Sequence, residues 1–244
     1  MEKHFNWKGH DWRITPYWGD HHSGKPDVWY GTDSVRIEDN GSLVLDCVYN
    51  PKSFPDGFIR KYSVGYVVCE EDFKYGTFEW SAKLPQGLNM WPGLWLDSSK
   101  EWPPEIDCME GWTRGKRDTY VKRLLWVDIH PTMHWTENGE HKSEAKFNIS
   151  RFRVDLNGWN DFKVEWTPNG VSVYYNGKLI KTFNNKKMLE HFNREDILMP
   201  PIMTFDIWED FPGEFTEERY ADYKDNGSPL VVRNFKYTPY KSNM

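Results

Sequence analysis

The sequence predicts an all-β protein, a single two-sheet β-sandwich that takes up residues 1–244. Three observations lead to this fold class. Alternation of apolar and polar residues with a period of two is widespread, helix signals are sparse, and the 18 glycines and 15 prolines are spread along the chain, as in short strands joined by turns. No internal repeat, low-complexity tract or linker interrupts the sequence, and 244 residues suffice for one large sandwich.

Each expected element has its own signal. The clearest strand covers residues 76–84, where every second side chain from Phe78 to Leu84 is apolar. Two hairpins follow one another within residues 161–183, and the second turns at Asn176-Gly177, a pair that favours the positive φ angles of a type I′ turn. The other expected elements are strands at residues 42–49, 63–69 and 231–240 and short helices at residues 186–192 and 215–223.

Charge and hydropathy argue against two classes of protein. The chain carries 31 basic and 37 acidic residues, a net charge of −6, whereas a protein that binds nucleic acid is normally basic. The sequence has no run of 18 apolar residues that could span a membrane. The first residues are too polar for a signal peptide, so either the chain stays inside the cell or a leader was removed before this numbering begins.

The three cysteines, Cys47, Cys69 and Cys108, do not have the spacing of a metal-binding motif. They allow at most one disulfide, with one thiol left over. We expect three buried free thiols that pack as small apolar residues.

Aromatic residues are unusually frequent. The 14 tryptophans, 13 tyrosines and 14 phenylalanines make up 17% of the chain, more than a core of this size needs. Flat apolar ligands, of which sugar rings are the commonest, would use the surplus. The alternative is an aromatic-rich core, and composition alone leaves both open.

The most informative segment is residues 104–112, PEIDCMEGW, where three acids lie among apolar residues. In a regular strand Glu105 and Asp107 would point to one face, and Glu110 would point to the core on the other, at a high cost in free energy. A β-bulge at Cys108-Met109 shifts the alternation by one residue and returns Glu110 to the face of the other two. We therefore predict three carboxyl groups on one face of a bulged strand.

Three like charges on one surface raise the pKa of at least one of them. A retaining glycosidase needs such a group, because one carboxylate acts as nucleophile while a protonated carboxyl acts as acid. A solvated acidic edge strand and a calcium site are the alternatives. Indole faces stack on sugar rings, so the four tryptophans around the acids favour a sugar site: Trp91, Trp95, Trp102 and Trp112. For Trp95, core packing is an equal alternative.

Residues 62–96 followed by PEIDCMEGW resemble glycoside hydrolase family 16. Two later stretches agree: GWNDFKVEWTPNGVSVYYNGKLI at residues 158–180 is similar to the family's strand pair after the catalytic strand, and VVRNFKY at residues 231–237 resembles its closing strand. The resemblance covers roughly residues 28–240. It implies a concanavalin-like β-jelly roll with a concave substrate cleft, and an endo-acting, retaining hydrolase of β-linked polysaccharides.

The resemblance also implies roles for individual residues. Glu105 would be the nucleophile, Glu110 the general acid and then the general base, and Asp107 would lie between them and hold the geometry of Glu105. The mechanism would be a double displacement through a covalent glycosyl-enzyme. His134-Trp135 resembles a pair of a histidine and an aromatic residue that lines the cleft in relatives; the alternative is a surface histidine beside a core tryptophan.

The chain departs from the family at two places. Glucan-cleaving members carry a glycine-rich stretch after the strand that matches residues 200–208, whereas this chain continues EDFPGEF. Many members have an acidic residue linked to a structural calcium ion where this chain has Val232. We therefore expect no metal and no other cofactor.

A basic stretch, RGKRDTYVKR at residues 114–123, follows the segment with the three acids. Arg114 and Arg117 could pair there with sulfate or uronate groups of an anionic polymer. The alternative is a solvated loop that balances nearby acids.

Together these features predict one catalytic domain that acts on a polysaccharide, most simply a β-1,3/1,4-glucan. A marine galactan such as agarose, porphyran or carrageenan is the alternative substrate, and a transglycosylase or a non-catalytic lectin is the alternative function. We expect a monomer without a nucleic-acid partner or a membrane span. Because polymeric substrates occur outside the cell, we expect an extracellular or periplasmic location.

Overall fold

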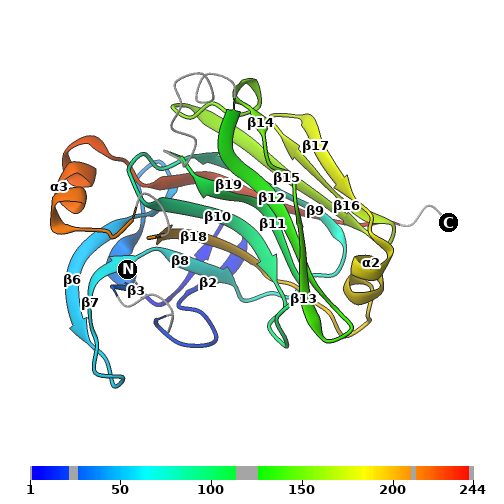
Figure 1. The fold of residues 1–244 in the computed structure, drawn as a ribbon, viewed down its shortest axis with the longest axis horizontal. Coiled ribbons are helices and arrows are strands. Elements are labelled where there is room, and N and C mark those ends of the chain that lie inside the picture. The colour runs from blue at the N-terminus through cyan, green and yellow to red at the C-terminus, as the bar shows by residue number, and fades with distance from the viewer. Residues whose placement is uncertain (1, 22–26, 114–125, 210–212, 242–244) are drawn as a thin grey trace.

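The computed structural model describes residues 2–21, 27–113, 126–209 and 213–241 of the chain. Two large antiparallel sheets pack face to face as a sandwich, and a small three-stranded sheet extends one end (Figure 1). This arrangement confirms the predicted all-β class and the β-jelly roll. No helix in the described part of the chain is long and apolar enough to cross a membrane.

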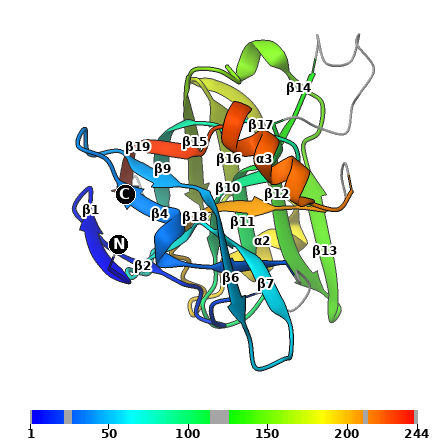
Figure 2. The ribbon, with the colours of Figure 1, turned by 90° about the vertical axis from the view of Figure 1, so that its left-hand side faces the viewer.

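The larger sheet has nine strands, in the order β1-β2-β8-β18-β10-β11-β12-β13, with β14 paired to β12. Its hairpin β1–β2 lies at one edge and β13 at the other (Figure 2). The strands are β1 (His4–Trp7), β2 (His10–Ile14), β8 (Tyr66–Cys69), β18 (Pro201–Ile207), β10 (Met90–Asp97), β11 (Glu105–Trp112), β12 (Trp126–Glu137), β13 (Glu140–Ala145) and β14 (Ile149–Ser150).

The second sheet has seven strands, in the order β17-β16-β15-β9-β19-β5-β4, and the third has the order β3-β7-β6. The strands of the second sheet are β17 (Lys178–Phe183), β16 (Gly170–Tyr175), β15 (Trp159–Thr167), β9 (Gly76–Lys83), β19 (Leu230–Pro239), β5 (Leu43–Leu45) and β4 (Val35–Ile37). The remaining elements are β3 (Val28–Tyr30), β7 (Ile59–Val64), β6 (Cys47–Ser53), the helices α2 (Lys186–Phe192) and α3 (Glu217–Asn226), and two short 3₁₀ turns, η1 (Thr32–Ser34) and η2 (Arg151–Arg153).

The core between the two large sheets is built by the alternation seen in the sequence. On β9, Phe78, Trp80 and Ala82 are buried against the other sheet, while the residues between them are more exposed or lie at the outer face. Trp12 and Trp166 are also fully buried. Part of the aromatic surplus therefore serves the core, and the three cysteines are buried free thiols, as predicted.

Two expected strands are each divided, for local physical reasons. The strand expected at residues 42–49 breaks at Asp46, whose carboxylate accepts hydrogen bonds from the Cys47 N–H and the Tyr223 hydroxyl, so β5 and β6 enter different sheets. The strand expected at residues 63–69 breaks at Gly65, where a Cβ atom would lie 2.5 Å from the Cβ of Leu45. Glycine permits this close approach of two layers.

The other expected elements are confirmed with small shifts. The helix expected at residues 186–192 is α2, and the helix expected at 215–223 is α3, which begins two residues later because Thr216 caps it through its side-chain oxygen. The second hairpin turns at Asn176-Gly177 with φ angles of 50° and 72°, as a type I′ turn requires.

Candidate active site

A cleft of about 960 Å³ opens on the face of the nine-stranded sheet that is turned away from the core. Its floor is formed by β10, β11, β12 and β18, which lie side by side in Figure 1. Residues before β3 and the loop after β10 form its walls. The described lining residues include all three acids of the segment PEIDCMEGW.

The predicted β-bulge places the three acids in this cleft. On β11, Asp107 pairs with Thr132 and Glu110 pairs with His130, so β11 contains one residue more than β12 between these pairs. The pairing with β10 shifts at the same point. The extra residue keeps Cys108 and Met109 in the core and returns Glu110 to the cleft, which confirms the predicted shift of alternation.

Each outer acid has one short hydrogen bond from a neighbouring side chain. Trp102 Nε1 donates to Glu105 Oε2 over 2.7 Å, and Thr132 Oγ1 donates to Glu110 Oε1 over 2.5 Å. Asp107 between them is 3% exposed. Its Oδ2 atom has no hydrogen-bond donor among the described residues. The two outer carboxyl groups are therefore held in place while the middle one is enclosed.

Two histidines of β12 face the acids. His134 Nε2 lies 3.4 Å from Asp107 Oδ2 and 3.8 Å from Glu105 Oε1, while His130 Nε2 lies 3.6 Å from Glu110 Oε1. His134 Nδ1 is 2.8 Å from Nε2 of His141, a residue whose pKa is lowered by burial and by the neighbouring His134. A hydrogen bond donated by His141 Nε2–H to His134 Nδ1 places the proton of a neutral His134 ring on Nε2, the atom that faces the carboxyl groups.

Burial and crowding raise the pKa values of two of these acids. For Glu105 the causes are burial and then the charge of Asp107; for Asp107 they are burial and then the charge of Glu110. The Trp102 N–H and His134 act in the opposite direction on Glu105. Both carboxyl groups therefore hold a proton to a higher pH than a free carboxyl group does, as the crowding of like charges predicts.

Asp97, a fourth acid in the cleft, has no signal in the sequence beyond its place at the end of an apolar strand. It lies opposite Glu105 on β10, is 2% exposed, and accepts a 2.7 Å hydrogen bond from the Tyr17 hydroxyl. Its Oδ1 atom is buried without a hydrogen-bond partner among the described residues. Burial raises the pKa of Asp97 to about 7.

We expect the Asp97→Asn variant to be more stable than the wild type at neutral pH but not in acid. The carboxyl of Asp97 has an ordinary pKa of 3.8 and a folded-state pKa of about 7, so the folded state holds the proton more tightly and stability falls as pH rises between these values. Asparagine avoids this loss and still accepts the Tyr17 hydrogen bond. The pKa difference limits the gain to about 4 kcal/mol. Urea unfolding at pH about 4 and about 8 measures it, and an equal effect at both pH values would contradict the assignment.

Three of the four predicted tryptophans line the cleft. Trp91 stacks on Trp208 with ring centroids 5.1 Å apart, Trp95 is half-buried on the floor, and Trp102 is 53% exposed above Glu105. Trp112 is not among the lining residues; it packs edge-on against Trp91 with centroids 4.3 Å apart. Trp112 therefore does not line the cleft as expected, and it supports Trp91 instead.

Trp135 corrects the expectation that both members of the pair His134-Trp135 face the substrate. Successive residues of a strand point to opposite faces, so His134 faces the cleft and Trp135 enters the core, where it is 5% exposed. The surface histidine beside a core tryptophan was the alternative. The other two predicted binding residues, Arg114 and Arg117, lie outside the described residues.

Several cleft residues come from segments that the sequence analysis passed over. Tyr17 and Trp18 precede the first family-like segment, and Asp206 and Trp208 lie at the end of the strand just before the departure from the glucan-cleaving pattern. The sequence does not show that Trp208 stacks on Trp91. Among the described residues, Glu105, Asp107 and His134 also offer ligand atoms within 4.8 Å of one another, close enough to hold a cation.

A jelly-roll sandwich whose concave face carries crowded carboxyl groups and exposed indole rings defines a carbohydrate-active protein of the glycoside hydrolase class. The chain belongs to family 16 of the glycosyl hydrolases, whose family model matches residues 22–216. This match confirms the resemblance and the predicted class.

Two relatives and one solved structure illustrate the family. The chain is 28% identical to glucan endo-1,3-beta-glucosidase A1 of Niallia circulans, over 64% of this chain and 23% of the relative. It is 27% identical to a beta-1,3-glucan-binding protein of Penaeus monodon, over 69% of this chain and 45% of the relative. The laminarinase catalytic domain of Thermotoga maritima shares the fold with a TM-score of 0.68 at 21% identity, over 95% of this chain and 92% of that one. The chain thus spans less than half the length of these two curated relatives.

Proposed function

We propose that this chain forms one catalytic domain that hydrolyses internal bonds of a neutral β-1,3/1,4-glucan with retention of configuration. One observation carries the proposal: Glu105, Asp107 and Glu110 lie on the same face of a bulged strand, at the floor of a cleft lined with indole rings. A binding protein would gain nothing from crowding three like charges on one strand. Double displacement requires two carboxyl groups about 5–5.5 Å apart that flank the scissile bond, one as nucleophile and one as acid.

In the proposed mechanism, Glu105 attacks the anomeric carbon while Glu110 donates a proton to the departing glycosidic oxygen. The bond to the leaving sugar breaks as the bond to the Glu105 carboxylate forms. Glu110, now a carboxylate, takes a proton from water, whose oxygen attacks the anomeric carbon on the side that the leaving sugar has vacated, opposite Glu105, and displaces the Glu105 carboxylate. Two inversions at one carbon restore the original configuration.

Asp107 keeps Glu105 ionised in this scheme. In the resting enzyme we place one proton on the general acid Glu110 and one on Asp107, the most enclosed member of the cluster. A neutral Asp107 adds no like charge beside Glu105. The Trp102 N–H and His134 then stabilise the carboxylate of the nucleophile.

The charges of the cleft support a neutral substrate over a sulfated one. Lys100 is the only lysine or arginine among the lining residues that the structure describes. Six acids line the same cleft: Asp97, Glu101, Glu105, Asp107, Glu110 and Asp206. A polymer with sulfate groups would meet repulsion along this surface. The two relatives, a glucan endo-1,3-beta-glucosidase and a beta-1,3-glucan-binding protein, agree with a neutral substrate.

The aromatic surfaces support binding of several sugar units. The stacked pair Trp91–Trp208 and the exposed ring of Trp102 lie on either side of the acids along the lining. Sugar rings stack on such surfaces, so an internal segment of a polymer can pass over the acids. We also propose an extracellular or periplasmic location, where such polymers occur, and a monomeric state.

Incubation with laminarin, lichenan, agarose, porphyran and carrageenan tests this function. We expect mixed oligosaccharides at early times from laminarin or lichenan, and the β-anomer as the first product in proton NMR. Products from sulfated polymers alone would contradict the charge argument, and products longer than the donor would indicate transglycosylation. Binding without any product would mean a glucan-binding protein and would refute the catalytic proposal.

A further inference from the structure

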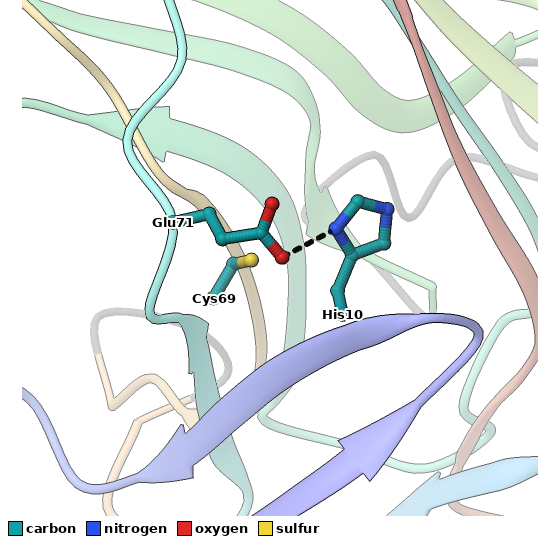
Figure 3. Close-up of side chains that lie close together, drawn as sticks. All are labelled: His10, Cys69 and Glu71. Atoms are coloured by element: carbon teal, nitrogen blue, oxygen red, sulfur yellow. Dashed lines mark hydrogen bonds and ion pairs between the residues drawn. The ribbon is translucent and has the colours of Figure 1, made fainter.

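A second cluster of potential metal ligands lies outside the cleft. His10 of β2, Cys69 of β8 and Glu71 just after β8 point toward one another (Figure 3). Each offers one ligand atom, and these atoms all lie within 4.8 Å of one another. His10 Nδ1 is 2.8 Å from Glu71 Oε1.

Strand register brings these three side chains together. Strands β2 and β8 are antiparallel and pair Trp12 with Cys69. The Glu70 N–H donates to the Asp11 carbonyl over 2.8 Å, so the pairing continues past β8 and places His10 opposite Glu71. Because Cys69 and Glu71 are two residues apart, their side chains share one face. The cluster is thus set by the backbone pairing of β2 with β8 and with the segment directly after β8.

The cluster lies on the core side of the sheet, opposite the cleft. Tyr66 lines the cleft, and alternation along β8 turns Cys69 to the other face, where it is 2% exposed. The His10 ring packs edge-on against Phe73 and Phe235, with centroids 5.9 and 5.3 Å away. The Glu71 side chain is 49% exposed. Two ligands are therefore held by apolar packing, and the third offers a route from solvent.

We propose that His10, Cys69 and Glu71 bind one zinc ion, with water in a fourth position. An imidazole, a thiolate and a carboxylate together suit zinc, whereas calcium and magnesium prefer oxygen ligands alone. At ordinary zinc–ligand bond lengths the three ligand atoms would lie about 3–4 Å apart, so each pair needs to move together or apart by less than about 2 Å.

Zinc at this position would fasten the hairpin β1–β2, which forms an edge of the nine-stranded sheet, to the segment after β8. His10 precedes residue 22, where the match to the family model begins. The site therefore combines a ligand from outside the matched region with two from inside it. We expect zinc to raise the melting temperature by several degrees, since an ion that binds the folded state alone stabilises it.

Titration with Co²⁺, a spectroscopic substitute for zinc, tests the proposal on the full chain. We expect one Co²⁺ per chain and a thiolate-to-cobalt charge-transfer band that zinc abolishes by displacement. This band distinguishes binding at the cluster from binding in the cleft, because Glu105, Asp107 and His134 contain no sulfur. Equilibrium dialysis with elemental analysis gives the zinc stoichiometry.

Matched variants distinguish this cluster from its surroundings. Cys69→Ser should abolish the band, whereas Cys47→Ala, which alters another buried free thiol, should keep it. Glu71→Gln, at an exposed position that tolerates change, should weaken binding at least tenfold. The control is Glu70→Gln, because Glu70 pairs with His4 and belongs to neither group of ligands.

A charge-transfer band that survives in Cys69→Ser would overturn the assignment. Co²⁺ that binds the wild type without a thiolate-to-cobalt band would also overturn it. Absence of bound zinc in the wild type would do the same. If Cys69→Ser fails to fold, the comparison of Glu71→Gln with Glu70→Gln decides, and equal affinities in those two variants would refute the site.

Discussion

Glu105→Gln is expected to lower kcat by roughly 10⁴-fold or more while leaving glucan binding within a few-fold of the wild type. The amide has almost the shape of the carboxylate and still accepts the 2.7 Å hydrogen bond from Trp102, so the cleft should keep its form. It cannot attack the anomeric carbon, and no glycosyl-enzyme forms. Reducing-end release measures kcat, and calorimetry with an oligosaccharide of the preferred glucan measures binding.

The matched control for this variant is Glu101→Gln. Glu101 also lines the cleft, but its carboxylate is engaged by His191 and Arg194. We expect its turnover to stay within a few-fold of the wild type. Turnover like that of the wild type in Glu105→Gln would end the assignment of Glu105 as nucleophile. Equal losses in both variants would show that general loss of negative charge, and not a missing nucleophile, is responsible.

Glu110→Ala should lower kcat on a natural glucan by about 10²–10⁴-fold, because the departing oxygen leaves without a proton. An oligoglucoside with an activated aryl leaving group needs no such proton, so its first step should remain fast and the glycosyl-enzyme should accumulate. We expect the time course of phenol release to show a burst followed by slow steady-state turnover. Mass spectrometry should find the sugar attached to Glu105.

Azide provides the stereochemical check on Glu110→Ala. It needs no general base and fits the space left by the glutamate side chain, so it should restore turnover of the aryl substrate. Attack on the glycosyl-enzyme gives a β-glycosyl azide, since two displacements have then occurred at the same carbon. An α-glycosyl azide would mean one displacement only, and the roles proposed for Glu105 and Glu110 would be wrong.

The common face of Glu105, Asp107 and Glu110 could be predicted because it follows from local rules. Side chains alternate along a strand, a carboxylate in an apolar core is costly, and one inserted residue corrects the alternation. The same holds for the turn at Asn176-Gly177, whose positive φ angles are a property of the dipeptide. Such features depend on a few neighbouring residues, and the sequence contains all of them.

Trp135 shows where a motif taken alone misleads. The pair His134-Trp135 resembled a cleft-lining pair, but adjacent residues of one strand face opposite sides, and only the packing of the two sheets decides which side is the core. Trp112, on the next strand, packs edge-on against the cleft-lining Trp91 without lining the cleft itself, so the motif does not decide which of two neighbouring tryptophans is accessible. An excess of tryptophan predicts sugar contact for the group but not for each member.

The sequence by itself determined the all-β class, the bulged strand with its three acids, the free thiols and the family, because these rest on patterns within short segments or on stretches of similarity. Only the tertiary structure brought Asp97 opposite Glu105, Trp208 onto Trp91, and His10 against Cys69 and Glu71. The partners in these contacts lie on different strands of one sheet or next to them. Their proximity is set by strand order and register, which in turn depend on how the whole chain buries its apolar faces.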